Sequence, residues 1–223
     1  MTSPYERTYF EHVYRDYQRQ NPPRKMRFYR GLARRVLRDL PHPRVLDLGC
    51  ASGKFLASLD STWHRYGLDV SEFAIQQARM ALPGATLSVG SATDIPFDGP
   101  FDLITAFDLL EHVPAPDLLA EAVIPRLAPH GHFIFVVPVY DGLVGAVARY
   151  LDRDPTHTHK WSRSAWLAWT TTHFRLSAWC GIFRYLLPWG QYLHVPTTHL
   201  IRLTPAIAVT ARRVESRAGA FGV

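Results

Sequence analysis

Apolar positions follow two alternating patterns along the first 140 residues of this 223-residue chain. Short apolar runs predict five strands, at residues 45–48, 63–70, 85–89, 101–107 and 131–137. Apolar residues at helical spacing predict helices after residues 53, 71 and 118, between successive strands. Strands that alternate with helices imply a parallel sheet, and ligands bind such sheets at the carboxyl ends of the strands.

Two aromatic and apolar stripes precede the first strand. Apolar residues continue at helical spacing from Tyr29 to Leu40, and Asn21 followed by two prolines predicts where that helix begins. An earlier stripe near helical spacing is aromatic and consists of Tyr5, Tyr9, Phe10, Tyr14 and Tyr17. We therefore predict an N-terminal helical cap over residues 1–40 and a main domain over residues 41–223.

The last third of the chain has a weaker pattern. It predicts a short helix at residues 144–151, a helix capped by Ser162 and a sixth strand at residues 174–185. Residues 207–214 fit either a closing strand or a terminal helix. With a closing strand, the fold class is α/β, a doubly wound and mostly parallel sheet of seven strands.

The positive charge of the chain is concentrated near its beginning. The formal net charge is +6, and residues 1–44 alone carry +7. Such a segment could meet nucleic acid, an anionic lipid surface or an acidic substrate. The arginines at 27, 30, 34, 35 and 38 fall off the apolar stripe, so we expect a solvated helix face with no specific nucleic-acid partner.

Composition excludes several classes of protein. Two cysteines imply neither a disulfide framework nor a metal quartet. The longest apolar stretch, residues 133–139, falls far short of the roughly 20 residues that a membrane span needs. The N-terminus has no apolar signal segment, so we expect a cytoplasmic protein without a membrane span, and the oligomeric state stays open.

Residues 44–59 contain the most informative motif, a strand, a turn of small residues and a helix. The turn reads Asp47-Leu-Gly49-Cys-Ala51-Ser-Gly53. Glycine lets the backbone approach a ligand closely, and the first amides of a helix bind anionic and polar groups. A dinucleotide fingerprint would need a third glycine at Lys54, which disfavours that interpretation.

This turn resembles the nucleotide-binding loop of the class I S-adenosylmethionine (SAM) methyltransferases. Their pattern is an acidic residue, one further residue and Gly-x-Gly-x-Gly, and here Ala51 replaces the middle glycine. The resemblance implies a Rossmann-like fold, SAM as the cofactor and S-adenosylhomocysteine (SAH) as its product. It also implies cofactor contacts from the loop residues Asp47, Gly49, Cys50, Ala51 and Gly53.

Later strand ends supply further candidate contacts to the cofactor. Asp69 follows Asp47 by 22 residues, at the tip of the second strand, where a carboxylate can accept from both ribose hydroxyls. The resemblance assigns Asp94 to the exocyclic amine of adenine and Ile95 to its ring. The contacts expected from these strand ends are Asp69, Val70, Ala92, Asp94, Ile95 and Phe107, the last bordering the methionine part.

The fourth strand is followed by Glu111-His112, a pair that resembles a methyltransferase subset that includes ubiquinone-pathway enzymes. The resemblance implies methyl transfer to an oxygen or nitrogen atom of a small-molecule acceptor. Candidate general bases are His112, His157 and His159, because an unperturbed imidazole titrates near neutral pH. We expect acceptor contacts from Tyr14, Tyr17, Tyr140 and Trp161.

Two alternatives stay open. A metal-dependent RNA ribose 2′-O-methyltransferase would use Asp108, Glu111 and His112 with one later histidine, whereas we expect no metal. A non-catalytic scaffold of the same fold would not need Asp47, Asp69 and Asp94 together. Arginine outnumbers lysine 22 to 3, which is typical of a GC-rich bacterial genome and suggests natural-product biosynthesis.

Overall fold

The structure is a computed structural model that describes residues 21–151, 154, 156–186 and 192–214. Of the predicted site residues, Tyr14 and Tyr17 lie outside this range. The division into a cap over residues 1–40 and a main domain over residues 41–223 stays a prediction.

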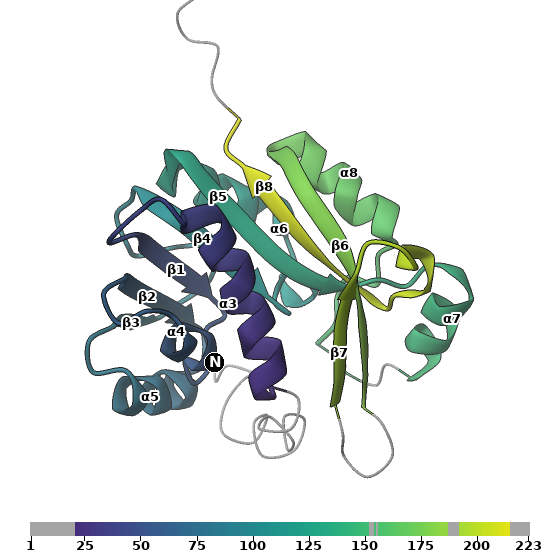
Figure 1. The fold of residues 1–223 in the computed structure, drawn as a ribbon, viewed down its shortest axis with the longest axis horizontal. Coiled ribbons are helices and arrows are strands. Elements are labelled where there is room, and N and C mark those ends of the chain that lie inside the picture. The colour runs from purple at the N-terminus through teal and green to yellow at the C-terminus, as the bar shows by residue number, and fades with distance from the viewer. Residues whose placement is uncertain (1–20, 152–153, 155, 187–191, 215–223) are drawn as a thin grey trace, which may run out of the picture.

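An eight-stranded sheet runs through the molecule in the order β3-β2-β1-β4-β5-β8-β6-β7 (Figure 1). Five neighbouring strands are parallel: β1 (Arg44–Leu48), β2 (His64–Asp69), β3 (Thr86–Val89), β4 (Phe101–Phe107) and β5 (Leu127–Pro138). Three strands extend the sheet through antiparallel pairs: β8 (Ala206–Arg212), β6 (Arg175–Leu186) and β7 (Tyr192–Thr197). The α/β prediction is therefore confirmed, and residues 207–214 resolve largely to strand β8.

The predicted number of seven strands is wrong by one strand. The additional strand is β7, which pairs with β6 as the second arm of an antiparallel hairpin. Pro196 lies inside it, and proline within a sheet is confined mainly to edge strands because it lacks a donor for the ladder. β7 is indeed an edge strand, and this proline is what lowers its strand signal in the sequence.

Three of the described helices lie between parallel strands, and the others precede or follow them. The helices are α3 (Pro23–Leu37) before the sheet, α4 (Lys54–Ser58), α5 (Glu72–Ala81) and α6 (Pro116–Val123) between strands, and α7 (Gly142–Leu151) and α8 (Arg163–His173) after β5. Ser71 and Ser162 cap α5 and α8 by accepting from backbone amides three residues on, at 3.2 and 3.1 Å. Short 3-10 turns are η1 (Leu110–His112), η2 (Ile124–Arg126) and η4 (Ile201–Leu203).

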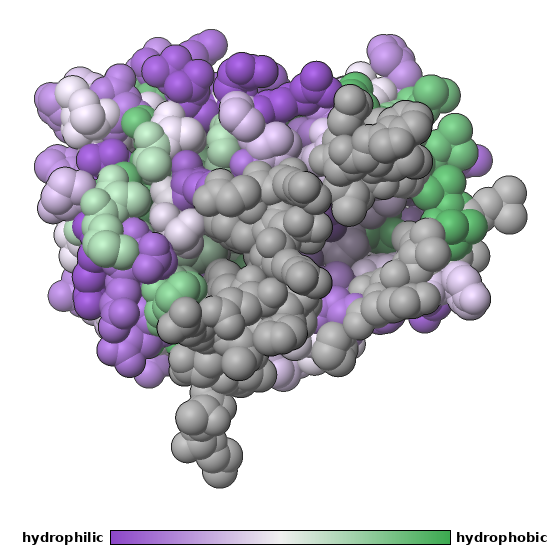
Figure 2. Space-filling view, turned by 90° about the horizontal axis from the view of Figure 1, so that it is seen from below, coloured by the Kyte–Doolittle hydropathy of each residue, from purple (hydrophilic) through white to green (hydrophobic). Residues whose placement is uncertain are grey.

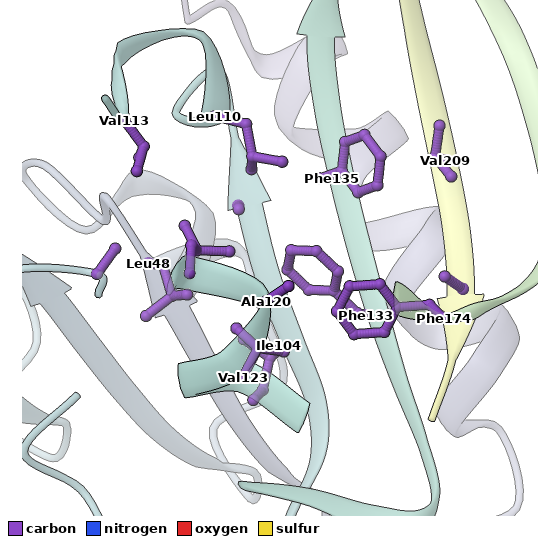
Figure 3. Close-up of a cluster of buried hydrophobic side chains, with 14 of the residues drawn as sticks. Leu48, Ile104, Leu110, Val113, Ala120, Val123, Phe133, Phe135, Phe174 and Val209 are labelled. Atoms are coloured by element: carbon purple, nitrogen blue, oxygen red, sulfur yellow. The ribbon is translucent and has the colours of Figure 1, made fainter. Parts of the chain in front are cut away.

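Two apolar cores cover the two faces of the sheet, because successive side chains of a strand point to opposite faces. In β5, Phe133 and Phe135 belong to one core, whereas Ile134 and Val136 belong to the other. Figure 3 shows part of the first core, where Phe133, Phe135 and Phe174 lie near one another. A continuous apolar run is what a parallel strand buried on both faces requires.

Helix α3 packs its apolar stripe against α4 and the strands β4 and β5. Its buried apolar residues are Tyr29, Leu32, Ala33 and Leu37. The prediction of a solvated arginine face is confirmed for residues 27, 34, 35 and 38. Arg30 is half-buried and donates to the Ser58 carbonyl at 3.4 Å. Among the described helices, none is long and apolar enough to cross a membrane.

Candidate functional site

The turn after β1 lies against the end of β2. The amides of Gly49 and Cys50 both donate to the Leu68 carbonyl, at 2.8 and 3.1 Å. Ala51 has φ +45°, a left-handed conformation that costs an L-residue roughly 1–2 kcal/mol, and its amide donates to Asp69 Oδ2 at 2.8 Å. That bond to a carboxylate helps to hold a conformation in which the family pattern has glycine.

A cavity of about 260 Å³ opens at this edge of the sheet. It lies where β1, β2, β3 and β4 end, and α3 contributes a further wall. Of the predicted cofactor contacts, it is lined by Asp47, Gly49, Cys50, Ala51, Asp69, Val70, Ala92 and Phe107. Most of the expected residues therefore meet in one place.

Asp69 holds the turn and faces the cavity at the same time. Its Oδ2 accepts from Ala51 and its Oδ1 accepts from the Ser71 amide at 2.9 Å. Burial raises the pKa of this carboxyl, although the backbone amides of Ser71, Ala51 and Val70 oppose the shift. A carboxylate oxygen has two lone pairs, so the group can still accept from a ligand diol.

Asp47 is the most deeply buried carboxyl of the lining, with 3% of its surface exposed. Thr105 donates to its Oδ1 at 2.7 Å. Burial raises the pKa of Asp47 to about 7, against the lowering effect of the Thr105 hydroxyl and with a further rise from Asp69. Near neutral pH this group therefore exchanges between its charged and neutral forms.

Three predicted cofactor residues do not line the cavity. Asp94 is exposed, because its amide closes a turn onto the Ser91 carbonyl at 3.0 Å and the lining ends at Thr93. Ile95 packs in the apolar core instead. Gly53 serves packing, since a Cβ there would lie 2.5 Å from Leu82 Cδ1 on the far side of the turn.

Residues 90–93, and not Asp94 or Ile95, line the cavity after β3. They follow β3 directly, and the hydroxyls of Ser91 and Thr93 are 2.8 Å apart. The signal for these lining residues was therefore the end of β3 itself, and the role of Asp94 toward adenine stays a prediction.

Sequence reasoning gave Asp108 only a place in the metal alternative, yet it is the centre of a buried ion cluster beside the cavity. Lys25 Nζ donates to its Oδ2 at 2.8 Å, Arg184 Nη1 donates to its Oδ1, and Tyr29 donates at 3.3 Å. Burial alone would raise the pKa of Asp108, but Arg184 and Lys25 hold it well below its usual range. Asp108 has φ +54° and lines the cavity together with Tyr29 and Phe107, whose rings stack at 4.0 Å.

The three predicted bases take different positions. His112 lines the cavity, and His157 lies behind it with ring centroids 4.6 Å apart. His159 places Nε2 2.9 Å from the Val113 carbonyl and 3.3 Å from that of Pro114, so it ties one loop to another. His112 is therefore the one of the three that lines the cavity.

The contacts of His112 fix its tautomer. Its Nδ1 lies 2.9 Å from Thr156 Oγ1, and the Thr156 hydroxyl donates to Asp154 Oδ1 at 2.5 Å. Because a hydroxyl has one proton to donate, the Nδ1 of His112 must be the donor in its bond to Thr156. The lone pair of a neutral His112 is then on Nε2.

Tyr140 and Trp161, the other predicted acceptor contacts, lie behind the histidines. Tyr140 Oη is 3.1 Å from His157 Nδ1. The Trp161 ring packs against His159 at 4.8 Å and Trp166 at 4.5 Å. Neither residue is part of the cavity lining.

Glu111, His112 and His157 could together hold a metal ion, since their ligand atoms lie within 4.8 Å of one another. Glu111 is 1% exposed, and its Oε2 has no hydrogen-bond partner among the residues that the structure describes. Burial, helped by Asp108, raises the pKa of Glu111 to about 8. Asp108 is engaged by Lys25 and Arg184, so the ligand set of the metal-dependent alternative is assembled only in part.

Comparison with known proteins points to one family. Residues 15–178 match the family model described as a methyltransferase domain. The ubiquinone biosynthesis O-methyltransferase of Aromatoleum aromaticum is 34% identical over 99 residues, which are 41% of this chain and 42% of that relative. The chain thus spans less than half of that relative's length.

Two solved structures share the fold. The magnesium protoporphyrin IX methyltransferase of Synechocystis, solved with bound SAH, has a TM-score of 0.64 at 16% identity. The match covers 93% of this chain and 98% of that protein's chain. A 4+2 cyclase has a TM-score of 0.63 at 17% identity, over 85% of this chain and 81% of its own. Since this fold serves two different reactions, the fold alone does not determine the chemistry.

Asp47→Asn should change how stability depends on pH. Because the folded state raises the pKa of Asp47 from 3.8 to about 7, the protonated form favours folding, and its contribution is lost as pH rises between these values. Asparagine does not ionise, so the fall in unfolding free energy between about pH 5 and pH 8 should be smaller in the variant. Urea unfolding at the two pH values checks this, and an unchanged fall would contradict it.

Proposed function

Since the chain belongs to the SAM-dependent methyltransferases, we propose that it transfers the methyl group of SAM to an oxygen or nitrogen atom of a small-molecule acceptor. The observation that carries the proposal is the convergence of Asp47, Asp69 and Phe107 from three strand ends on one cavity. The name of the Aromatoleum aromaticum relative favours oxygen as the methylated atom.

The lining of the cavity suits each part of the cofactor. Asp69 would accept from the ribose hydroxyls, and residues 90–93 would border the adenine. Lys54, a cation of the same lining, suits the carboxylate of the methionine part. SAM itself supplies a methyl carbon that is already activated by the neighbouring sulfonium. The protein's task is then to hold the acceptor in line with that carbon, which can contribute several kcal/mol.

His112 is the proposed general base for a hydroxyl acceptor. Its Nε2 would accept the proton of an acceptor hydroxyl, whose oxygen would receive the methyl group that bound SAM supplies. The imidazolium would keep its Nδ1 proton and donate it in the hydrogen bond to Thr156 Oγ1, and the Thr156 hydroxyl donates in turn to Asp154 Oδ1. A neutral amine acceptor would attack directly and lose its proton afterwards, so it needs no base before the transfer.

A metal-assisted form of the same reaction is the second candidate. It is favoured by the buried Glu111 Oε2, which has no partner within the described part of the chain and belongs to the cluster with His112 and His157. Carboxylate and imidazole ligands suit Mn²⁺ and Zn²⁺, and a cation there could lower the pKa of an acceptor hydroxyl. We propose the metal-free form, in which Glu111 is protonated near neutral pH because burial raises its pKa to about 8.

We propose no nucleic-acid acceptor for this site. The exposed arginines of α3 lie on its solvated face, and none of them lines the cavity. Non-specific binding through such a face would weaken steeply with salt, because each neutralised phosphate releases counterions.

Asp69→Asn should weaken SAH binding about ten-fold or more. The amide removes the charge and one acceptor from a buried hydrogen-bond network, a loss of roughly 1.5–3 kcal/mol. Asp94→Asn is the matched control, because Asp94 is exposed and outside the lining, and it should bind SAH as the parent does. Calorimetric titration with SAH measures both variants. An unchanged dissociation constant for a folded Asp69→Asn protein would remove Asp69 from the cofactor site.

His112→Gln should lower kcat for hydroxyl acceptors by about 10²–10⁴ and leave SAH affinity within about two-fold, because a base contributes to proton transfer and not to cofactor binding. Transfer of labelled methyl groups from SAM to catechols, phenols and amines gives the rates. His173→Gln, a substitution at a half-buried histidine that is paired with Asp117 and lies outside the cavity lining, is the control.

The same assay separates the two candidate forms. Turnover that persists in EDTA supports the metal-free form. Turnover that stops in EDTA and returns with Mn²⁺ or Mg²⁺ would establish the metal-assisted form instead. If His112→Gln methylates phenols at the parent rate, His112 is not the base.

A further inference from the structure

Helix α7 and the turn η4 form an exposed apolar surface on one side of the molecule. Tyr150 and Val147 of α7 are 85% and 58% exposed, and they lie three residues apart, on the same side of the helix. Leu200 and Leu203, at the two ends of η4, are 59% and 49% exposed. Because α7 lies against η4, we group these four residues and name their surface the α7–η4 face.

The gathering of these side chains sets the α7–η4 face apart. In Figure 2, hydrophobic residues gather at the right edge of the molecule, which is the side on which Figure 1 places α7. Exposed apolar residues elsewhere, such as Met80 of α5 and Leu118 of α6, belong to separate elements. Single exposed apolar side chains are ordinary, whereas contiguous ones mark interaction surfaces.

The α7–η4 face lies in a part of the chain with very few carboxylates. Residues 155–214 contain no Asp or Glu and seven Arg or Lys, and α7 has no acidic residue. Arg149 of α7 and Arg202 of η4 are both exposed. Of the acidic residues that flank α7 in the sequence, Asp141 is paired with Arg163 at 3.0 Å and Asp154 accepts from Thr156. Asp152 lies outside the described residues.

We propose that the α7–η4 face binds the surface of an anionic lipid bilayer. Aliphatic side chains beside a tyrosine and arginines are the combination that lies at the boundary between headgroups and acyl chains. Each arginine near an anionic bilayer strengthens binding about five-fold. Tyr150 projects from the surface with most of its side chain exposed. A projecting side chain suits insertion between lipid headgroups, whereas a protein partner with a protruding residue would need a groove on this face.

The α7–η4 face adjoins the candidate site. Arg149 donates to the Lys160 carbonyl at 3.0 Å and lies 5.9 Å from the Tyr140 ring, and Tyr140 contacts His157. A protein seated by this face therefore has its histidine cluster close to the bilayer surface. The inference rests on exposure and charge alone and does not depend on methyl transfer.

Sedimentation of the full-length protein with lipid vesicles tests the proposal. We expect binding to phosphatidylcholine vesicles that contain about one third phosphatidylglycerol, much weaker binding to pure phosphatidylcholine, and a loss of binding as salt is raised. The double variant Val147→Glu/Tyr150→Glu should bind the anionic vesicles roughly ten-fold or more weakly. Met80→Glu is the matched control, because it adds an acid at an apolar residue that is 70% exposed on α5, and it should bind nearly as the parent does.

A charge variant keeps the test decisive if the double variant fails to fold, which thermal melting would reveal. Arg149→Gln/Arg202→Gln keeps the apolar side chains and should weaken binding by more than about ten-fold, from five-fold for each arginine. Absence of binding to anionic vesicles would overturn the proposal. So would equal losses in the α7 and Met80 variants, or a loss caused only by Arg27→Gln/Arg34→Gln on α3. Binding to soluble polyglutamate but not to vesicles would assign the face to an acidic protein and would also overturn it.

Discussion

The carboxylate of Asp108 is the contact on which the site's architecture depends. It joins the end of β4 to Lys25 of α3 and to Arg184 of β6. Lys25 is 83 residues from Asp108 along the chain, and Arg184 is 76 residues from it. Removing one member of such a buried ion group typically costs about 3–5 kcal/mol, because the remaining charges lose their partners in a poorly solvated place. Asp108 therefore fixes α3 and the β6–β7 hairpin against the open end of the parallel sheet. It also accounts for the position of Tyr29, which donates to Asp108 while its ring stacks on Phe107 in the cavity wall.

Three aspartates at neighbouring strand ends have different electrostatic surroundings and therefore different uses. Burial raises the pKa of Asp47 to about 7, with Thr105 as its hydrogen-bond donor. Asp69 keeps backbone donors on both oxygens, which orient it toward the cavity. Asp108 lies between two cations and stays ionised. One residue type thus provides a titrating group, a hydrogen-bond acceptor and a structural charge, and the neighbours of each decide which.

Local pattern predicted what local geometry determines. The strand, turn and helix around Gly49, the position of Asp69 and the span of β4 follow from short-range spacing, and the structure has them. Contacts between distant segments were beyond that reasoning: the Lys25–Asp108–Arg184 cluster and the His112–Thr156 bond join segments 44 or more residues apart and leave no periodic signal. Asp94 shows a second limit, because which residues after β3 line the cavity depends on how one turn directs its side chains. The edge strand β7 was missed because Pro196 weakens its strand pattern.

The central claim is that the cavity at the ends of β1 to β4 is a SAM site. Calorimetric titration of the full-length protein with SAH, and separately with NAD, tests it most directly, because both ligands contain adenosine but carry different groups on the 5′ carbon of its ribose. The account predicts micromolar-class binding of SAH and no comparable binding of NAD, since the turn at Ala51 lacks the third glycine of a dinucleotide loop. Binding of NAD without binding of SAH would contradict it.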